Sequence, residues 1–245
     1  MEQYSNLSLV YDELMDVDYN KWADFVSTYF KNKNIELKYK KGLELGCGTG
    51  NMTIYLKKLG LDLVALDSSE DMLTKAEEKL RSERLRVSLL KQDIRNYNLN
   101  KKFPFIFSFC DCFNYITNLI DLENSFKNVY NHLEDGGYFL FDISTEYKLR
   151  NLIGEKTFTL NREDICYIWD NYINEDILEM YITFFVKEGK YYRRFDERHL
   201  QKIYRVEEII EIIKKIGFKE VEVFDDYKFK EYSQDSIRAV FVIKK

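Results

Sequence analysis

The chain has 245 residues, a mass of 29.6 kDa and 45% hydrophobic residues, which suits one large α/β domain with an elaboration better than two independent domains. Its formal net charge of -5 argues against an extended nucleic-acid surface, because such surfaces need clustered Lys and Arg. The four cysteines form no C-x-x-C pair, and the two histidines lie far from them, so the common metal-site spacings are absent. We therefore expect a small-molecule substrate and no metal.

The sequence contains no pattern of a membrane or export segment. No apolar run approaches the roughly 18 to 20 residues of a membrane-spanning helix, and the acidic first residues lack a basic-then-apolar signal pattern. We expect a cytoplasmic protein without membrane partners.

Helix and strand patterns alternate along the first part of the chain. Apolar residues at helical spacing predict a helix from residue 20, after Asp18 or a neighbouring cap. The following helices are expected at 51–60, at 68–80 with Ser68 and Asp71 in capping-box form, and up to Leu133 before Gly136 and Gly137. The expected strands are 42–46, 61–67, 84–94, 103–111 and 138–144. Repeated strand-then-helix units predict a mostly parallel sheet with helices on both faces, which binds its ligand beyond the carboxyl ends of the strands.

The pattern changes to period two from about residue 155. Strands at 157–161, 165–172, 177–186 and 190–205 predict an antiparallel β insert of three or four strands. The apolar stripe of a helix at 206–218 then returns the chain to the main domain, followed by strands at 219–226 and 237–245. We thus divide the chain into an N-terminal helical segment and core at 1–154, an insert at 155–205, and a C-terminal helix and strands at 206–245.

A glycine-rich stretch, "LELGCGTGNMT" at residues 43–53, follows the first strand. Gly46, Gly48 and Gly50 permit a tight turn and a close approach of backbone to a ligand. A dinucleotide fingerprint has the form G-x-G-x-x-G, whereas here the spacing is G-x-G-x-G and Asn51 stands where the third glycine belongs. The loop predicts a nucleotide-like cofactor without fixing which one.

Acidic residues end the next two strands. Asp67 lies where a carboxylate accepts hydrogen bonds from both hydroxyls of a ribose, and Met72 follows one helical turn later, where its thioether could cover an adenine. Asp93 and Ile94, at the end of the third strand, are suited to the amine edge and the face of the same base. Each of these residues has a plain structural alternative as a cap or core residue, but the ordered set indicates one binding site.

The motifs "LELGCGTG", "ALDSSEDML", "KQDI", "FPFIFSFCDCFNYI" and "LEDGGYFLFDI" occur in an order that resembles the class I S-adenosylmethionine-dependent methyltransferases. The resemblance implies a Rossmann-like seven-stranded sheet, mostly parallel with an antiparallel last strand, and S-adenosylmethionine as cofactor. It implies that Glu44 and the glycine loop hold the methionine part, Asp67 the ribose, and Asp93 with Ile94 the adenine. The full set of expected cofactor contacts is Glu44, Gly46, Cys47, Gly48, Gly50, Asp67, Ser68, Met72, Asp93, Ile94, Cys110 and Asp111.

Within that family the chain is similar to the small-molecule subgroup of aminosugar and glycine N-methyltransferase-like enzymes, on its N-terminal "YDELMDVDY" and its β insert. Two departures argue against methylation of nucleic-acid bases. The Asn/Asp-Pro-Pro-Tyr/Phe signature cannot occur because Pro104 is the only proline, and neither Cys110 nor Cys112 follows a proline, as the nucleophile of cytosine-carbon methyltransferases does. We expect methyl transfer to N or O of a small metabolite.

The catalytic candidates are Tyr11, Asn114 and His199, with Tyr19, Tyr115, Arg193 and Glu197 as further pocket candidates. Alternate residues from 191 to 203 share one strand face that is dense in functional groups, which would suit a lid over a polar substrate. His199 is the candidate general base because the reference pKa of histidine is near neutral.

Three other functions stay open from the sequence. The chain could methylate tRNA or protein, could be a nicotinamide-dependent oxidoreductase, or could bind the cofactor without turnover. The acceptor, the methylated atom and the oligomeric state are not specified by any motif.

Overall fold

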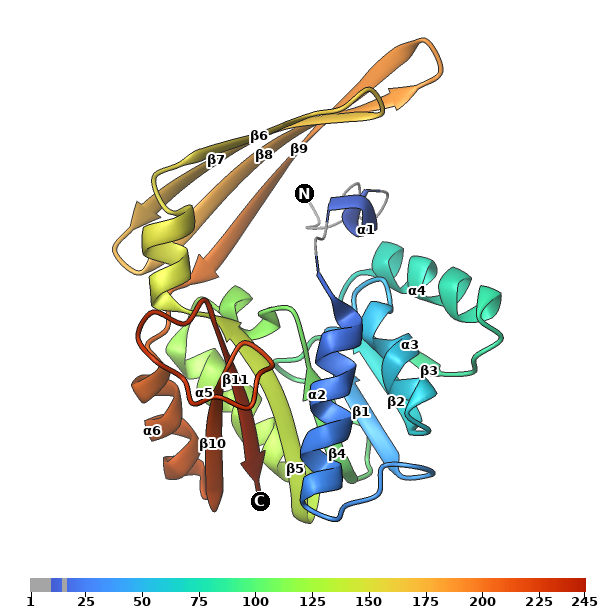
Figure 1. Cartoon of the computed structure of the whole chain (residues 1–245), viewed down its shortest axis with the longest axis vertical. Helices are drawn as coiled ribbons and strands as arrows, with labels where there is room; N and C mark the ends of the chain where they lie inside the picture. Colours follow the sequence, from blue (N-terminus) through green and yellow to red (C-terminus); the bar gives the residue numbers. More distant parts are fainter. Residues whose placement is uncertain (1–9, 15–16) are drawn as a thin grey trace.

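The computed structural model describes residues 10–14 and 17–245. A seven-stranded sheet in the order β10-β11-β5-β4-β1-β2-β3 forms its centre (Figure 1). Neighbouring strands are parallel except β11, which is antiparallel to both β10 and β5. The strands are β1 (Lys41–Leu45), β2 (Asp62–Asp67), β3 (Ser88–Lys91), β4 (Phe103–Ser108), β5 (Leu133–Ser144), β10 (Glu220–Asp225) and β11 (Arg238–Lys244). The expected sheet with its antiparallel last strand is confirmed.

Helices cover both faces of this sheet, as expected from the alternating patterns. On one face α2 and α3 bury Phe30 and Leu56 against Phe107, and on the other α5 and α6 bury Phe126 and Ile209 beneath the sheet's opposite side chains. The helices are α1 (Tyr11–Leu14), α2 (Tyr19–Asn32), α3 (Asn51–Lys58), α4 (Glu70–Ser82), α5 (Leu119–His132) and α6 (Val206–Ile216). In the described part of the chain, no helix combines the length and apolar character needed to cross a membrane.

The helix caps show one success and one error of the sequence patterns. Asp18 caps α2 as expected, because its carboxylate accepts a hydrogen bond of 3.2 Å from the amide of Lys21. The cap of α4 is Ser69 rather than Ser68, since the Ser69 hydroxyl accepts from the amide of Met72 at 3.3 Å. Ser68 is thereby left at the strand end, beside the cavity described below.

The expected strand 84–94 is shorter in the structure. β3 spans only Ser88–Lys91, so Asp93 and Ile94 lie in the loop that follows it. Both residues still emerge at the carboxyl edge of the sheet, because β3 is parallel to β2 and in register with its end, where Asp67 pairs with Lys91.

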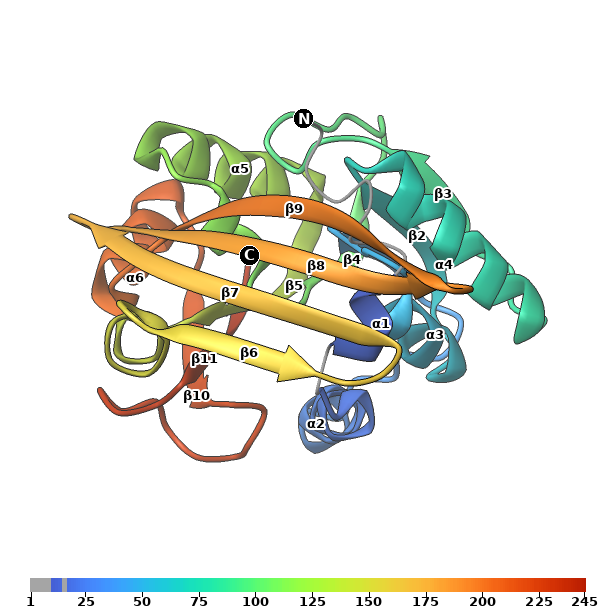
Figure 2. The same ribbon diagram turned by 90° about the horizontal axis from the view of Figure 1, so that it is seen from above.

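A second sheet of four antiparallel strands, in the order β6-β7-β8-β9, lies across the carboxyl ends of the central strands (Figures 1 and 2). It comprises β6 (Thr157–Asn161), β7 (Ile165–Asn174), β8 (Ile177–Glu188) and β9 (Tyr191–Lys202). The 3₁₀ helix η2 (Cys112–Tyr115) and the π-helix η3 (Lys148–Ile153) lie between the strand ends and this sheet. We call this second sheet the insert sheet; it falls inside the expected insert at 155–205.

Asn114 fixes the insert sheet to the core. Its buried amide nitrogen donates to the carbonyl oxygens of Ser144 at 3.1 Å and Lys202 at 3.0 Å, and its oxygen accepts from the amide of Ser144 at 3.0 Å. One side chain thus joins η2 to the ends of β5 and β9. Because these partners are buried backbone groups, the amide has a clear structural role.

Candidate active site

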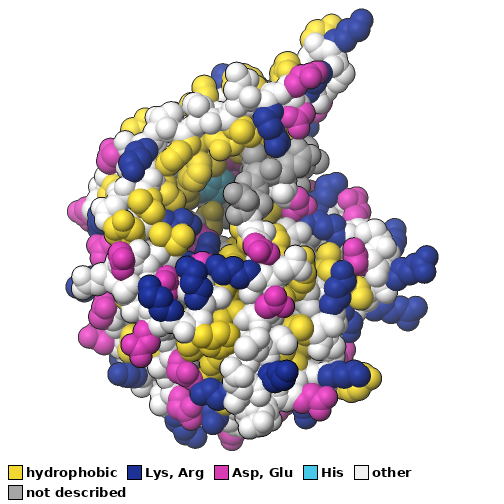
Figure 3. Space-filling model, viewed as in Figure 1, with side chains coloured by type: hydrophobic (Ala, Val, Ile, Leu, Met, Phe, Trp, Pro, Cys, Tyr) yellow, Lys and Arg dark blue, Asp and Glu magenta, His cyan; other side chains and the backbone are white. Residues whose placement is uncertain are grey.

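A cavity of about 760 Å³ separates the carboxyl ends of the central strands from the insert sheet. Figure 3 shows it as a hollow with apolar side chains along its upper wall. The loops after β1, β2 and β3 form one end of the cavity, the loops after β4 and β5 with the start of β11 form the other, and β7, β8 and β9 form the roof. Ligand cavities in proteins are commonly of this size.

The glycine loop leaves room for a ligand at one position only. All three glycines have positive φ, at +66°, +53° and +81° for Gly46, Gly48 and Gly50. A Cβ on Gly46 or Gly50 would collide with Cys112 or approach Ala76, whereas a Cβ on Gly48 would meet no atom within 4 Å. Gly50 therefore serves helix packing, and Gly48 borders open space at the end of the cavity formed by the loops after β1, β2 and β3.

Asp67 ends β2 with its carboxylate held by backbone amides. Oδ2 accepts from the amide of Gly48 at 2.8 Å and Oδ1 from that of Ser69 at 2.9 Å. Burial raises the pKa of Asp67, while these amides act in the opposite direction. The side chain lines the cavity, as does Met72 one helical turn later.

The loop after β3 closes the same end of the cavity. Asp93, Ile94 and Arg95 line it, and the Arg95 Nε donates to Asp93 Oδ2 at 2.9 Å. This interaction with Arg95 lowers the pKa of Asp93. An exocyclic amine at this carboxylate would therefore have to share it with the guanidinium.

Two predicted cofactor residues lie beside a small neighbouring pocket of about 30 Å³ rather than in the main cavity. Glu44 is buried there and accepts a hydrogen bond of 2.6 Å from the Thr53 hydroxyl. Burial raises the pKa of Glu44 to about 8, so its carboxyl group is largely protonated at neutral pH in this structure. Cys47 lines the same pocket, together with Tyr11.

Helix α1 lies against the glycine loop. Asp12 accepts hydrogen bonds from the Thr49 hydroxyl at 2.7 Å and the Asn51 amide at 2.9 Å, and pairs with Lys79 at 2.6 Å. These contacts hold the preceding Tyr11 over the border of both pockets. Burial raises the pKa of Tyr11, so its hydroxyl stays protonated and can donate a hydrogen bond.

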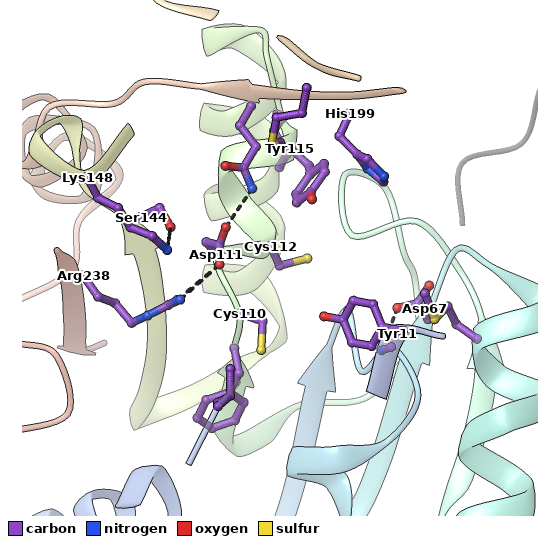
Figure 4. A pocket seen from close by; sticks show the side chains of 18 of the residues that line it. Tyr11, Asp67, Cys110, Asp111, Cys112, Tyr115, Ser144, Lys148, His199 and Arg238 are labelled. Carbon is purple, nitrogen blue, oxygen red and sulfur yellow. Dashed lines mark hydrogen bonds and ion pairs between the residues drawn. The ribbon is translucent and has the colours of Figure 1, made fainter. Parts of the chain in front are cut away.

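Two consecutive residues after β4 have left-handed backbone, Cys110 with φ 59° and Asp111 with φ 49°. This costly conformation turns both amides toward the buried carboxylate of Asp142, at 3.1 and 2.6 Å. Arg238, the first residue of β11, pairs with the buried Asp142. It also pairs with Asp111 (Figure 4). Burial alone would raise the pKa of Asp111, but the charges of Arg238 and Lys148 lower it, so Asp111 is an anion in the cavity wall.

His199 points from β9 into the cavity (Figure 4). Its ring meets that of Tyr115 edge to face at 6.0 Å between centroids, and burial lowers its pKa to about 4. Gln201, two residues later on the same face, donates to Asp111 at 2.7 Å. Two contacts therefore join the roof of the cavity to the chain after β4: the ring contact of His199 with Tyr115 and the hydrogen bond of Gln201 with Asp111.

The expected functional face of β9 extends over the cavity only near the core. Glu197 is buried beside His199 and does not line the cavity, and Arg193 lies at the exposed distal end, where it pairs with Glu188. The period of two predicted correctly which side chains share a face. It did not show how far along the strand the cavity extends.

The structure brings most of the predicted site residues together. Those that line the main cavity are Tyr11, Gly46, Gly48, Asp67, Ser68, Met72, Asp93, Ile94, Cys110, Asp111 and His199. Gly50 and Asn114 line neither pocket. The position of Asn114 does not support the predicted catalytic role, because its amide is used in joining β5 and β9.

Comparison with known proteins identifies the family. Residues 43–137 match a family model described as a methyltransferase domain. The chain is 33% identical to YqeM of Bacillus subtilis (strain 168), a protein named as a methyltransferase, over 99% of this chain and 97% of that one. A crystal structure of an S-adenosylmethionine-dependent methyltransferase from Clostridium acetobutylicum ATCC 824 is 38% identical, with 98% of each chain covered and a TM-score of 0.91. The chain belongs to the S-adenosylmethionine-dependent methyltransferases.

This methyltransferase also shares its fold with the sugar N-methyltransferase KedS8 from Streptoalloteichus sp. ATCC 53650. The two are 18% identical, with 97% of this chain and 91% of that chain covered and a TM-score of 0.79. The cofactor of the present methyltransferase is S-adenosylmethionine. The cavity suits that molecule because open space borders Gly48 and the Asp67 carboxylate faces the same space.

Proposed function

We propose that this enzyme transfers the methyl group of S-adenosylmethionine to N or O of a small metabolite bound beneath the insert sheet. The observation that supports this most directly is the cavity of about 760 Å³ under that sheet, which has room for a cofactor and a small acceptor together. The shared fold of a sugar N-methyltransferase agrees with an acceptor of this size.

We assign the cofactor to the end of the cavity that the loops after β1, β2 and β3 form. In this assignment Asp67 accepts from the ribose hydroxyls, Asp93 and Ile94 meet the adenine, and the methionine part lies between the glycine loop and Cys110. Bound there, S-adenosylmethionine supplies an electrophilic methyl group. The chain's own task is then to align the acceptor and to exclude water.

The acceptor would lie beneath the insert sheet, toward β4 and β5 from the cofactor, with Tyr11, Tyr115 and His199 around it. With a pKa of about 4, the His199 imidazole is neutral at physiological pH, so it does not repel a sulfonium and is in the form that can accept a proton. We assign His199 the role of proton acceptor and Tyr11 that of hydrogen-bond donor to the acceptor molecule. The N-terminal segment and the insert sheet together act as the lid.

The test has two steps, both on the full chain. Calorimetry with S-adenosylmethionine, S-adenosylhomocysteine and NADH should show binding of the first two only. A screen for S-adenosylhomocysteine formation should then include amines, aminosugars and hydroxy-aromatics beside bulk tRNA and protein. Turnover with a small compound is expected, and transfer to tRNA or protein alone would contradict the proposal.

A further inference from the structure

Four cationic side chains line the cavity: Lys21, Arg95, Lys148 and Arg238. Three of them form ion pairs with carboxylates: Lys21 with Asp226 at 2.6 Å, Arg95 with Asp93, and Arg238 with Asp111 and Asp142. Within residues 10–14 and 17–245, the ammonium of Lys148 forms no ion pair and donates one hydrogen bond, of 3.0 Å, to the Ser144 hydroxyl (Figure 4). An ammonium has three N–H donors, so Lys148 keeps two for water or a ligand.

The surroundings of Lys148 favour the arrival of a negative charge. Burial lowers its pKa, and Asp111 only partly offsets this effect. A charge that is partly removed from water and lacks a close counter-ion is stabilised by a hydrogen-bonded anion. A monoanionic carboxylate suits this position better than a phosphate with up to two charges, because Asp111 and Asp142 already contribute negative charge nearby.

The sheet order places Lys148 on the acceptor side of the cavity. Lys148 follows β5, while Asp67 ends β2, and β4 and β1 lie between these strands. Three strand spacings separate β2 from β5, which is about 14 Å at ~4.8 Å each. The roof of the cavity contributes the apolar side chains of Trp169, Met180 and Ile182. Trp169 and Met180 pack in one cluster with Leu149, the residue that follows Lys148.

We propose that Lys148 binds a carboxylate of the methyl acceptor, whose apolar part packs against Trp169, Met180 and Ile182. The proposal rests on the proposed function, because it presupposes that the acceptor enters this cavity. It narrows the substrate class to small amines or hydroxy compounds that carry both an acid group and an apolar body. The cofactor also carries a carboxylate, so the test must separate the two sources.

The test uses phenylacetate and its neutral analogue phenylacetamide as probes. Both are titrated by calorimetry into the protein saturated with S-adenosylhomocysteine. Wild type should bind phenylacetate at least tenfold more tightly than phenylacetamide. Lys148→Met should abolish this preference and leave the affinity for S-adenosylhomocysteine within twofold of wild type.

Two further variants make the result specific. Lys148→Arg keeps the charge and should keep the preference, and Lys190→Met removes an exposed lysine at the tip between β8 and β9 and should change nothing. The proposal is overturned by equal binding of the two probes, by no measurable binding of phenylacetate, or by a preference that survives Lys148→Met. It is also overturned if Lys148→Met weakens S-adenosylhomocysteine as much as phenylacetate, since Lys148 would then bind the cofactor.

Different results would overturn the role of Lys148 and the proposed methyl transfer to a small metabolite. Efficient methylation of neutral small acceptors, without benefit from an acid group, would overturn the role of Lys148 and support the function. Lack of methyl transfer to any small compound, by a protein that binds S-adenosylmethionine, would count against both.

Discussion

The amide of Gly48 donates a hydrogen bond of 2.8 Å to the carboxylate of Asp67, which joins the glycine loop to the end of β2 across 19 residues of sequence. The second carboxylate oxygen accepts from Ser69 at 2.9 Å. Both oxygens are thus oriented by backbone before any ligand arrives. Preorganisation of this kind reduces the entropic cost of binding.

Asp67→Ala should therefore weaken cofactor binding. Loss of a single hydrogen bond to a charged acceptor costs about 1.5–3 kcal/mol, so we expect the Kd for S-adenosylmethionine to rise by at least about 10- to 100-fold. Calorimetry measures this directly. The matched control is Asp62→Ala at the exposed opposite end of the same strand, which should bind as wild type does. Equal Kd values for the two variants would remove Asp67 from the site.

Alanine at two glycines of the loop should separate ligand binding from packing. Gly48→Ala introduces a Cβ into open space and should lower stability only by the ~1–2 kcal/mol of left-handed backbone. Gly50→Ala adds a contact of 3.2 Å with the backbone of Ala76, and such overpacking costs about 1–3 kcal/mol more. We expect urea unfolding to show the larger loss for Gly50→Ala and calorimetry a substantial loss of cofactor affinity for Gly48→Ala. The reverse order of stabilities would contradict this reading of the loop.

The succession of strands and helices along the chain, and the meeting of Asp67 and Asp93 at one edge of the sheet, could be predicted because their signals are local. Apolar runs, turn glycines and acidic residues at strand ends follow one another within a few residues, and Asp67 shows this plainly. The structural role of Asn114 could not be predicted, because its partners Ser144 and Lys202 lie 30 and 88 residues away in the sequence. A buried amide that joins backbone groups and one that binds a substrate give the same local pattern.

Arg238 was overlooked although a signal for it was present. A last strand that runs antiparallel begins at the edge where its parallel neighbours end, so the first residue of that strand belongs to the binding edge. Arg238 stands at a strand start, whereas the residues predicted for the site follow strand ends. Lys148 had no such signal, because the π-helix that carries it was not predicted.

Arg238→Met should strongly destabilise the fold. The guanidinium pairs with Asp142, whose side chain is fully buried, and with Asp111. Removing one partner of a buried ion pair leaves an uncompensated charge and typically costs about 3–5 kcal/mol. Arg198→Met, which breaks an exposed pair with Glu179, should cost much less. Urea unfolding of both variants tests this, and similar losses would mean that the buried pair has no special weight.

The burial of His199 predicts a pH dependence of stability. Its pKa is about 4 in the folded chain and 6.5 as a free side chain, so the folded state binds fewer protons between these values. Stability from this residue is complete above pH 6.5 and declines as the pH falls toward 4, by up to about 3 kcal/mol. His199→Gln cannot be protonated, so its stability relative to wild type should improve by that amount from pH 7 to pH 4. A constant difference across this range would show that His199 titrates normally.

The same low pKa sets the expected activity profile. If His199 accepts the proton released by the acceptor, His199→Gln should lower kcat by roughly 10²- to 10⁴-fold, while the Kd for S-adenosylmethionine stays within twofold. Because the imidazole is already neutral at pH 5, its protonation should not reduce wild-type kcat/KM between pH 7 and pH 5. A stopped assay for S-adenosylhomocysteine over this range measures both quantities. Unchanged turnover of His199→Gln would assign the proton to solvent and leave His199 as a wall of the cavity that orients the acceptor through its contact with Tyr115.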